Sequence, residues 1–185
     1  MNIALTLHRV VKSEKYRLNH EDITVDKLDY LLKKIQNSTF AIEDLNKNNQ
    51  NKSNFLLTFD DGFSSDFEIV FPMLKLMKIN AVFFIVTSSI GKKGYLNEEQ
   101  IVNLSKTGMT VGSHSVNHFD MSSLNKKNRM YELKNSKEKL ESIIGNRVNA
   151  FSFPYGRHTK NLIEQVYDSG YKYCFTSVPG FFNNS

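Results

Sequence analysis

The chain has 185 residues, of which 40% are hydrophobic and 23% charged, and its 24 basic and 19 acidic side chains leave a formal net charge of +5. This length predicts one domain, residues 1–185, and the composition is that of a globular protein rather than a disordered one. The charge excess is small and no Lys/Arg cluster is interleaved with stacking aromatic residues, which argues against a nucleic-acid partner. The single cysteine, Cys174, excludes a disulfide framework and a cysteine-rich zinc site. We predict it to be a small core residue on a strand.

The first residues do not resemble a secretory signal, because His8 and Arg9 interrupt the apolar run before it reaches the length of about 7–15 residues that such a signal needs. No stretch approaches the roughly 20 apolar residues of a membrane-spanning helix. We therefore expect no transmembrane segment. The expected location is cytoplasmic for the sequence as written, and extracytoplasmic if the chain is incomplete.

Short β-prone runs alternate with segments of helical periodicity along the whole chain. Strands are predicted at residues 3–7, 55–59, 81–86, 109–112, 148–153 and 171–176, and helices at 24–35, 64–77, 97–108, 124–144 and 160–168. Thr24 is an expected N-cap, Asn97 and Gln100 resemble a capping box, and Pro72 should kink its helix or mark a restart. The Asn-rich run 46–54 is predicted to be a solvated loop.

Regular alternation of strands and helices is typical of an α/β fold with parallel strands joined by right-handed helical crossovers. Either an open doubly wound sheet or a barrel satisfies this pattern. In both architectures, ligands bind at the carboxyl ends of the strands. The residues that follow each predicted strand are therefore the candidates for a functional site.

Two of these strand ends carry chemistry-bearing side chains in close succession. Asp60 and Asp61 follow the second strand and precede Gly62, a combination that alone is most often a turn. His114 and His118 follow the fourth strand, and their spacing lets both imidazoles face one divalent metal ion, although an isolated His pair is weak support for a metal site.

Two further strand ends add to this set. His8 follows the first strand, where it could be a core histidine, and Tyr155 lies in a Pro-Tyr-Gly turn after the fifth. Together these residues fall on one rim of the predicted sheet, which favours a metal-centred active site. Two histidines and a carboxylate suit a hydrolytic zinc site or an iron oxygenase. The second aspartate favours the hydrolase, which needs a base to take the proton of water.

With these residues in place, the chain resembles a polysaccharide deacetylase of carbohydrate esterase family four, the NodB-homology domain. The resemblance rests on Thr58-Phe59-Asp60-Asp61-Gly62, on His114-Ser115-Val116-Asn117-His118 and on Phe151-Ser152-Phe153-Pro154-Tyr155-Gly156. Leu7-His8-Arg9-Val10 is similar to an element of the circularly permuted poly-N-acetylglucosamine deacetylase branch, except that Leu7 replaces a tyrosine. The family fold is a distorted (β/α) barrel of about seven strands, and six are predicted here, so we expect a barrel that is incompletely closed.

The resemblance implies a role for each motif residue. Asp61, His114 and His118 would bind the metal, usually zinc or another divalent transition metal, and Asp60 would be the general base. The backbone N–H of Tyr155 would help to stabilise the oxyanion. His8 is the candidate general acid, because no histidine follows His158 to supply the C-terminal acid of the common family form.

Several departures from the family pattern leave alternatives open. Ser152 stands where an arginine commonly orients the base, and the chain has no tryptophan to line the acetyl pocket. Phe63, Phe119 and Tyr155 could supply an apolar wall or simply pack. His20 and His158 match no motif, and Asp120 and Arg157 flank the motifs and could support them.

The leading hypothesis is a metal-dependent hydrolase that removes N-acetyl groups from an N-acetylated sugar or glycan. The alternatives are an O-acetyl esterase, another non-peptide C–N hydrolase on the same scaffold, and a non-catalytic glycan-binding relative. A partner subunit in a homo-oligomer could cover the open barrel edge beside the first strand.

Overall fold

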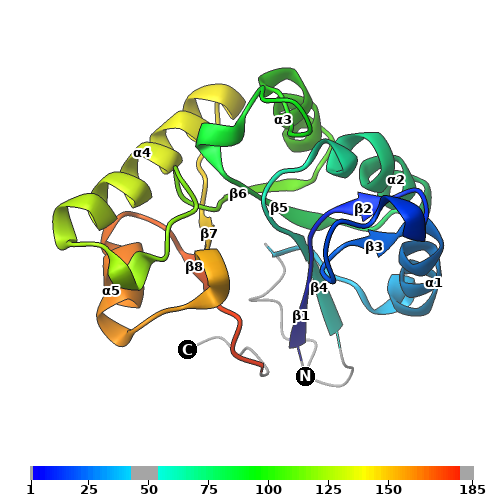
Figure 1. Cartoon of the computed structure of the whole chain (residues 1–185), viewed down its shortest axis with the longest axis horizontal. Coiled ribbons are helices and arrows are strands. Elements are labelled where there is room, and N and C mark those ends of the chain that lie inside the picture. The colour runs from blue at the N-terminus through cyan, green and yellow to red at the C-terminus, as the bar shows by residue number, and fades with distance from the viewer. Residues whose placement is uncertain (1, 43–53, 180–185) are drawn as a thin grey trace.

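The computed structural model describes residues 2–42 and 54–179. Six parallel strands form the main sheet in the order β1-β4-β5-β6-β7-β8 (Figure 1). Their bounds are β1 Asn2–Leu7, β4 Asn54–Phe59, β5 Ala81–Ile85, β6 Thr110–Ser113, β7 Ala150–Ser152 and β8 Tyr173–Phe175. The main helices are α1 Val25–Ile35, α2 Phe71–Met77, α3 Glu98–Lys106, α4 Lys126–Ile144 and α5 Lys160–Asp168.

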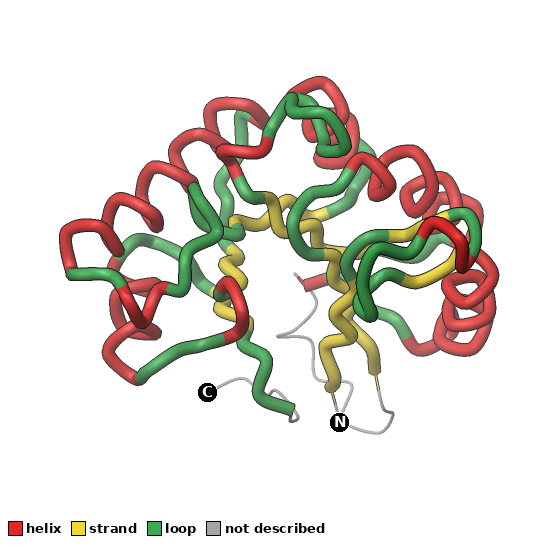
Figure 2. Tube along the Cα trace, in the orientation of Figure 1, coloured by secondary structure: helices red, strands yellow, loops and turns green. Residues whose placement is uncertain are grey.

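The sheet is curled, and the helices lie around its outer side (Figures 1 and 2). This arrangement decides between the two predicted architectures, because a doubly wound sheet would carry helices on both faces. Strands β1 and β8 are the two ends of the sheet, and neither pairs with a further strand in the described part of the chain. The prediction of an incompletely closed (β/α) barrel is therefore confirmed, and the oligomer expected to cover its edge stays a prediction.

The helices begin where the sequence predicts. The Thr24 side chain accepts a hydrogen bond from Lys27 N, and Asn97 and Gln100 form the reciprocal capping box. Pro72 marks a restart: a π-helical turn over Asp66–Val70 ends there, and α2 has the proline in its first turn. The helical backbone is continuous through this point, since Phe71 N bonds to Asp66 O, so the wider π-helical turn accommodates a proline that has no N–H to donate. No helix among residues 2–42 and 54–179 is long and apolar enough to cross a membrane.

One large cluster of buried side chains fills the space between the sheet and the helices. It includes the fully buried Phe59 and Phe83, whose rings stack at 5.2 Å between centroids. A second, smaller cluster lies around Leu56, Val82 and Phe84. Adjacent β4 and β5 therefore bury side chains on both faces, as strands covered on both sides do.

Two features differ from the sequence expectations, and a third expectation falls mostly outside the described residues. A second sheet of two parallel strands, β2 Val10–Val11 and β3 Ile23–Thr24, was not predicted, because two residues are too few to show a period. Cys174 lies on β8 but is only partly buried, since β8 is a sheet edge. Most of the Asn-rich run 46–54 lies outside the described residues, and its last member, Asn54, begins β4.

Candidate active site

The first motif follows β4 at the carboxyl edge of the sheet. Its backbone is fixed to β1, since Asp60 N donates to Leu7 O at 2.9 Å. Asp61 and Gly62 then adopt positive φ angles of 76° and 71°, which turn the chain sharply away from the strand. Left-handed backbone is costly for a non-glycine residue, so Asp61 is held in an uncommon conformation that a functional site can require.

The second motif follows β6 and contains two more residues of this kind. Ser115 and His118 have φ angles of 67° and 58°. The Oγ of Ser115 accepts a hydrogen bond from His118 N at 3.0 Å, which closes the loop into a tight turn. This turn folds His118 back towards His114, whose N–H is bonded to Ile85 O of the neighbouring strand.

Three potential ligand atoms converge as a result: Oδ1 of Asp61 and Nε2 of His114 and of His118. Asp61 Oδ1 lies 3.6 Å from His114 Nε2 and 3.3 Å from His118 Nε2, and the two ring nitrogens are 3.2 Å apart. Such separations are expected for ligands that each lie about 2.0–2.2 Å from one shared ion. Within residues 2–42 and 54–179, this is the cluster of His, Cys and acidic side chains that could hold a metal ion.

The protonation states of the two histidines suit a metal. The Nδ1 of His114 lies 2.8 Å from Ser152 O, a carbonyl that can only accept, so Nδ1 carries the hydrogen and Nε2 presents its lone pair. Burial lowers the pKa of His114 to about 4, and burial also lowers the pKa of His118. Both rings are therefore neutral near pH 7, which ligation requires.

Asp60 lies beside this cluster with a different environment. It is buried, its Oδ2 is 3.7 Å from His114 Nε2, and it accepts a hydrogen bond from Ser152 Oγ at 3.1 Å. Burial raises the pKa of the Asp60 carboxyl to about 7, and the neighbouring Asp61 adds to this, while His8 and Ser152 oppose it. Its Oδ1 is buried without a hydrogen-bond partner among the described residues. A carboxylate with a pKa near neutrality is suited to general-base chemistry.

His8 leaves the sheet next to Asp60, because the β1–β4 register pairs Leu7 with Phe59. Its ring is close enough that a positive charge on it lowers the pKa of Asp60. His8 is only partly buried, so it is not the enclosed core histidine that the sequence left as an alternative.

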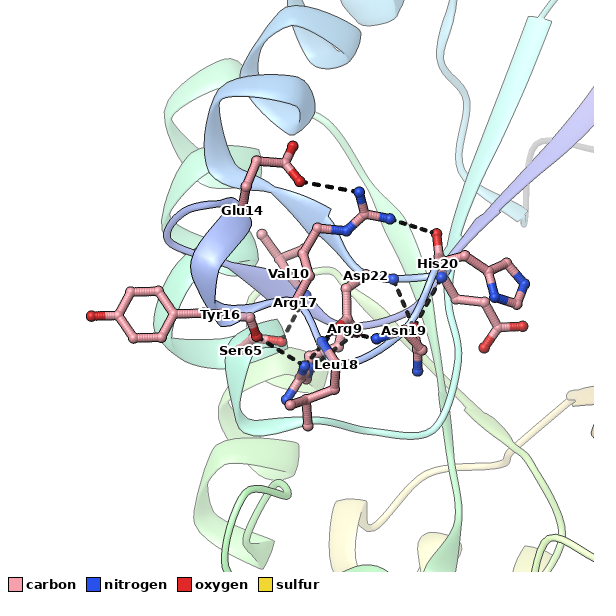
Figure 3. A network of polar contacts seen from close by, with 11 residues as sticks. Arg9, Val10, Glu14, Tyr16, Arg17, Leu18, Asn19, His20, Asp22 and Ser65 are labelled. Carbon is pink, nitrogen blue, oxygen red and sulfur yellow. Dashed lines mark hydrogen bonds and ion pairs between the residues drawn. The ribbon is translucent and has the colours of Figure 1, made fainter.

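The chain after His8 is fixed by a polar network (Figure 3). Nε of Arg9 donates to Oδ1 of Asp22 at 3.0 Å, Nη2 of Arg9 pairs with Oδ2, and the Asp22 carboxylate is buried. Val10 N donates to Ser65 Oγ at 3.2 Å, which ties this segment to the helical turn after the first motif. These contacts fix the backbone directly after His8.

Comparisons with known proteins show the family to which this sequence and fold belong. A sequence profile of the polysaccharide deacetylases matches residues 47–174. The chain belongs to the polysaccharide deacetylase family. It is 29% identical over 125 residues to YxkH of Bacillus subtilis strain 168, which is named as a polysaccharide deacetylase, over 68% of this chain and 45% of that protein.

One further relative and one solved structure extend the comparison. The poly-beta-1,6-N-acetyl-D-glucosamine N-deacetylase of Staphylococcus aureus strain MRSA252 is 24% identical over 141 residues, which cover 68% of this chain and 48% of that protein. The deacetylase PplD of Streptococcus pyogenes, in complex with acetate, has the same fold, with a TM-score of 0.83 at 24% identity over 92% of this chain and 80% of that one. The chain thus spans about half the length of YxkH and of the staphylococcal protein.

The third motif of this deacetylase family is a variant here, and the structure gives the variant residues clear positions. Ser152, in place of the usual arginine, contacts both Asp60 and His114. Tyr155 has a φ angle of 59°, and its exposed ring lies 4.8 Å from the His118 ring. Phe119 is also exposed, whereas Phe63 stacks on Tyr95 at 5.2 Å. Of the three, Tyr155 therefore lies against a proposed metal ligand, Phe119 is exposed, and Phe63 is partly buried and packs on Tyr95.

The remaining candidate residues lie outside the ligand cluster. Asp120 and Arg157 form an exposed ion pair of 2.7 Å that joins the loops of the second and third motifs. His158 is partly buried, and its Nδ1 lies 3.1 Å from Gly156 O in the third-motif turn. His20 is exposed outside the cluster. Sequence reasoning missed Glu132 of α4, which accepts hydrogen bonds from the second-motif loop. In the sequence, Glu132 could have been noticed only as a carboxylate directly before Leu133, on the face of the helix that is buried. That position does not indicate which group the carboxylate binds.

Proposed function

We propose that the chain is a metal-dependent N-deacetylase that hydrolyses the acetamide of an N-acetylated sugar or glycan. The observation that carries this proposal is the convergence of Asp61, His114 and His118 beside the buried Asp60. A separate carboxylate next to the three ligands is what hydrolysis needs and what ligation alone does not explain. The printed name of the staphylococcal relative, an N-deacetylase, supports the choice of an amide substrate.

The donor set fits a divalent transition metal, because two neutral imidazoles and one carboxylate leave positions open for water and substrate. Asp61, His114 and His118 would hold it. Such an ion would supply Lewis-acid chemistry, which acidifies a water molecule and polarises the acetamide carbonyl.

The chain's own residues then account for the protons. Asp60 takes a proton from the attacking water as its oxygen bonds to the acetamide carbon, and the backbone N–H of Tyr155 donates a hydrogen bond to the oxygen that gains charge. The C–N bond breaks when His8, in its protonated form, gives a proton to the departing nitrogen. The products are acetate and a free amine on the sugar.

Metal analysis combined with acetate release tests the proposal. The purified protein is loaded with zinc or cobalt and incubated with N-acetylglucosamine oligomers and, in parallel, with O-acetylated sugars. We expect acetate from the N-acetylated substrates and a loss of about 10²–10⁴-fold in Asp60→Asn, which keeps the shape of the side chain but cannot accept the proton.

The matched control is the metal content of Asp60→Asn, which should equal that of the wild type because Asp60 is not one of the three ligands. A metal-loaded wild type that binds these sugars but releases no acetate would favour the non-catalytic alternative. Release from the O-acetylated sugars alone would favour the esterase.

A further inference from the structure

We propose that Glu132 is a positioning residue that holds the loop between His114 and His118 in the shape that binds metal. This inference rests on the metal centre of the proposed function. Glu132 lies on the second turn of α4, a helix that contributes no ligand and contacts no reacting atom.

Both oxygens of the Glu132 carboxylate accept hydrogen bonds from the loop. Its Oε2 accepts from the backbone N–H groups of Val116 and Asn117, both at 2.8 Å, and its Oε1 accepts from Asn117 Nδ2 at 2.7 Å. The residue is only 2% exposed. A buried carboxylate that receives several hydrogen bonds makes strong, directional contacts, so it fixes both consecutive amides of the turn at once.

The loop needs such an external hold because its backbone is strained. Ser115 and His118 both have positive φ angles, which are unfavourable for a non-glycine residue and persist only where the surroundings enforce them. Inside the loop, His118 N bonds to Ser115 Oγ, and from outside it Thr87 N and Ser88 N donate to the carbonyl oxygens of Ser115 and Val116. These bonds leave the N–H groups of Val116 and Asn117 to Glu132. Val116 and Asn117, the residues between the two strained positions, are the ones that Glu132 holds.

The next turn of α4 has a related contact of its own. Ser136 is buried, and its Oγ lies 2.8 Å from the Oγ of Ser113, the last residue of β6. The Oγ of Ser113 in turn accepts from Ser115 N at 3.2 Å. Helix α4 thus contacts the end of β6 through Ser136 and the loop between the two histidines through Glu132. By holding both, it orients His118 towards the point where the three ligand atoms converge.

Two variants isolate the role of Glu132. Glu132→Leu keeps the volume but accepts no hydrogen bond. Glu132→Gln can keep all three bonds: its Oε1 accepts from the backbone amides of Val116 and Asn117, and the Asn117 side chain can rotate so that its Oδ1 accepts from the glutamine Nε2. We expect cobalt affinity to fall about 10–100-fold in Glu132→Leu, as for other residues that orient metal ligands, and to stay within about threefold in Glu132→Gln.

Hydrogen exchange of the metal-free protein gives a readout that needs neither metal nor substrate. The amides of Val116 and Asn117 should exchange at least about tenfold faster in Glu132→Leu than in the wild type, and near the wild-type rate in Glu132→Gln. Leu140→Ala is the stability control, because Leu140 is buried two turns further along α4. It should lower the melting temperature without changing loop exchange or cobalt affinity.

Unchanged exchange at Val116 and Asn117 together with unchanged cobalt affinity in Glu132→Leu would overturn the inference, and so would equal losses in Leu140→Ala. If Glu132→Leu does not fold, Glu132→Asp replaces it, because the shorter side chain keeps the charge but cannot reach both amides. A wild type that binds no cobalt would refute the metal centre, whereas the exchange measurement still decides whether Glu132 holds the loop.

Discussion

Ser152 links the proposed base to a proposed ligand: its Oγ donates to Asp60 Oδ2 at 3.1 Å, while its carbonyl oxygen lies 2.8 Å from His114 Nδ1. One residue of β7 therefore favours the ionised form of Asp60, against the larger effect of burial, and fixes the tautomer of His114. The serine at this position substitutes for the usual arginine with a neutral hydrogen bond instead of a positive charge.

Ser152→Ala should shift the pH dependence of activity upwards. The hydrogen bond from Ser152 stabilises the ionised form of Asp60, so its loss raises the pKa of that carboxyl. The base must be ionised to accept a proton, so activity rises with pH through this pKa. The acid limb of the pH–activity profile should therefore move to higher pH by about one unit in Ser152→Ala. The measurement is kcat/KM for acetate release as a function of pH.

Ser152→Thr keeps the hydroxyl and the backbone carbonyl, so its acid limb should stay near that of the wild type. An acid limb that does not move in Ser152→Ala, or moves to lower pH, would show that the contact does not tune the base.

His8→Ala should slow amide hydrolysis more than ester hydrolysis. An amine leaves poorly without a proton, whereas an alcohol leaves more readily, so loss of the acid should cost about 10²–10³-fold on N-acetyl substrates and much less on O-acetyl ones. Turnover of both substrate types by the same metal-loaded preparation gives the comparison.

His20→Ala is the matched histidine control, because His20 is exposed and outside the ligand cluster. Equal losses on amide and ester in His8→Ala would contradict the assignment of His8 as the acid. They would point instead to a role in holding Asp60, with which His8 interacts electrostatically.

The sequence was sufficient to predict that Asp60, His8 and His114 lie together, because consecutive parallel strands end on the same edge of a sheet. The register confirms this physical basis, since Leu7 pairs with Phe59 and Ile85 with Ser113. What fixes these side chains was harder to predict. A hydrogen bond between Glu132 and a loop 15 residues away follows from how a helix packs, which no local pattern encodes.

The lowered pKa values of the histidines predict a metal affinity that changes little in mild acid. A histidine with an ordinary pKa near 6.5 is largely protonated at about pH 6, whereas His114 stays neutral until its pKa near 4 is approached. In Asp60→Asn, which removes a neighbouring carboxyl group whose own pKa of about 7 lies in this range, cobalt affinity should therefore fall less than about threefold between about pH 7.5 and about pH 6. Titrations at both values, with a chelator as competitor, measure it.

His118→Asn is the control for this titration, because it removes one imidazole while the backbone hydrogen bonds to Ser115 and Glu132 keep the loop folded. Its affinity should be much lower at both pH values. An affinity of Asp60→Asn that drops more than about tenfold by pH 6 would show that the ligating imidazoles are not held neutral by burial.

Asp66 is buried in the π-helical turn, and neither carboxyl oxygen has a hydrogen-bond partner among the described residues. Burial, with Asp61 and Asp60 nearby, raises its pKa well above the ordinary value. A raised folded-state pKa means that the folded protein binds the proton more tightly than the unfolded chain, so Asp66 reduces stability progressively as pH rises above about 4. Asp66→Asn, which has no charge to bury, should relieve this cost.

The free energy of unfolding, measured in urea on the metal-free protein, tests this difference. At about pH 8 Asp66→Asn should be more stable than the wild type by at least about 1 kcal/mol. At about pH 4 the two should agree to within about 0.5 kcal/mol, because Asp66 is then protonated in the folded protein and about half protonated in the unfolded chain. Glu68→Gln, an exposed carboxylate in the same turn, should show no such pH-dependent gain. A stability difference between Asp66→Asn and the wild type that is the same at both pH values would mean that the substitution acts through packing, and that Asp66 is not a buried acid.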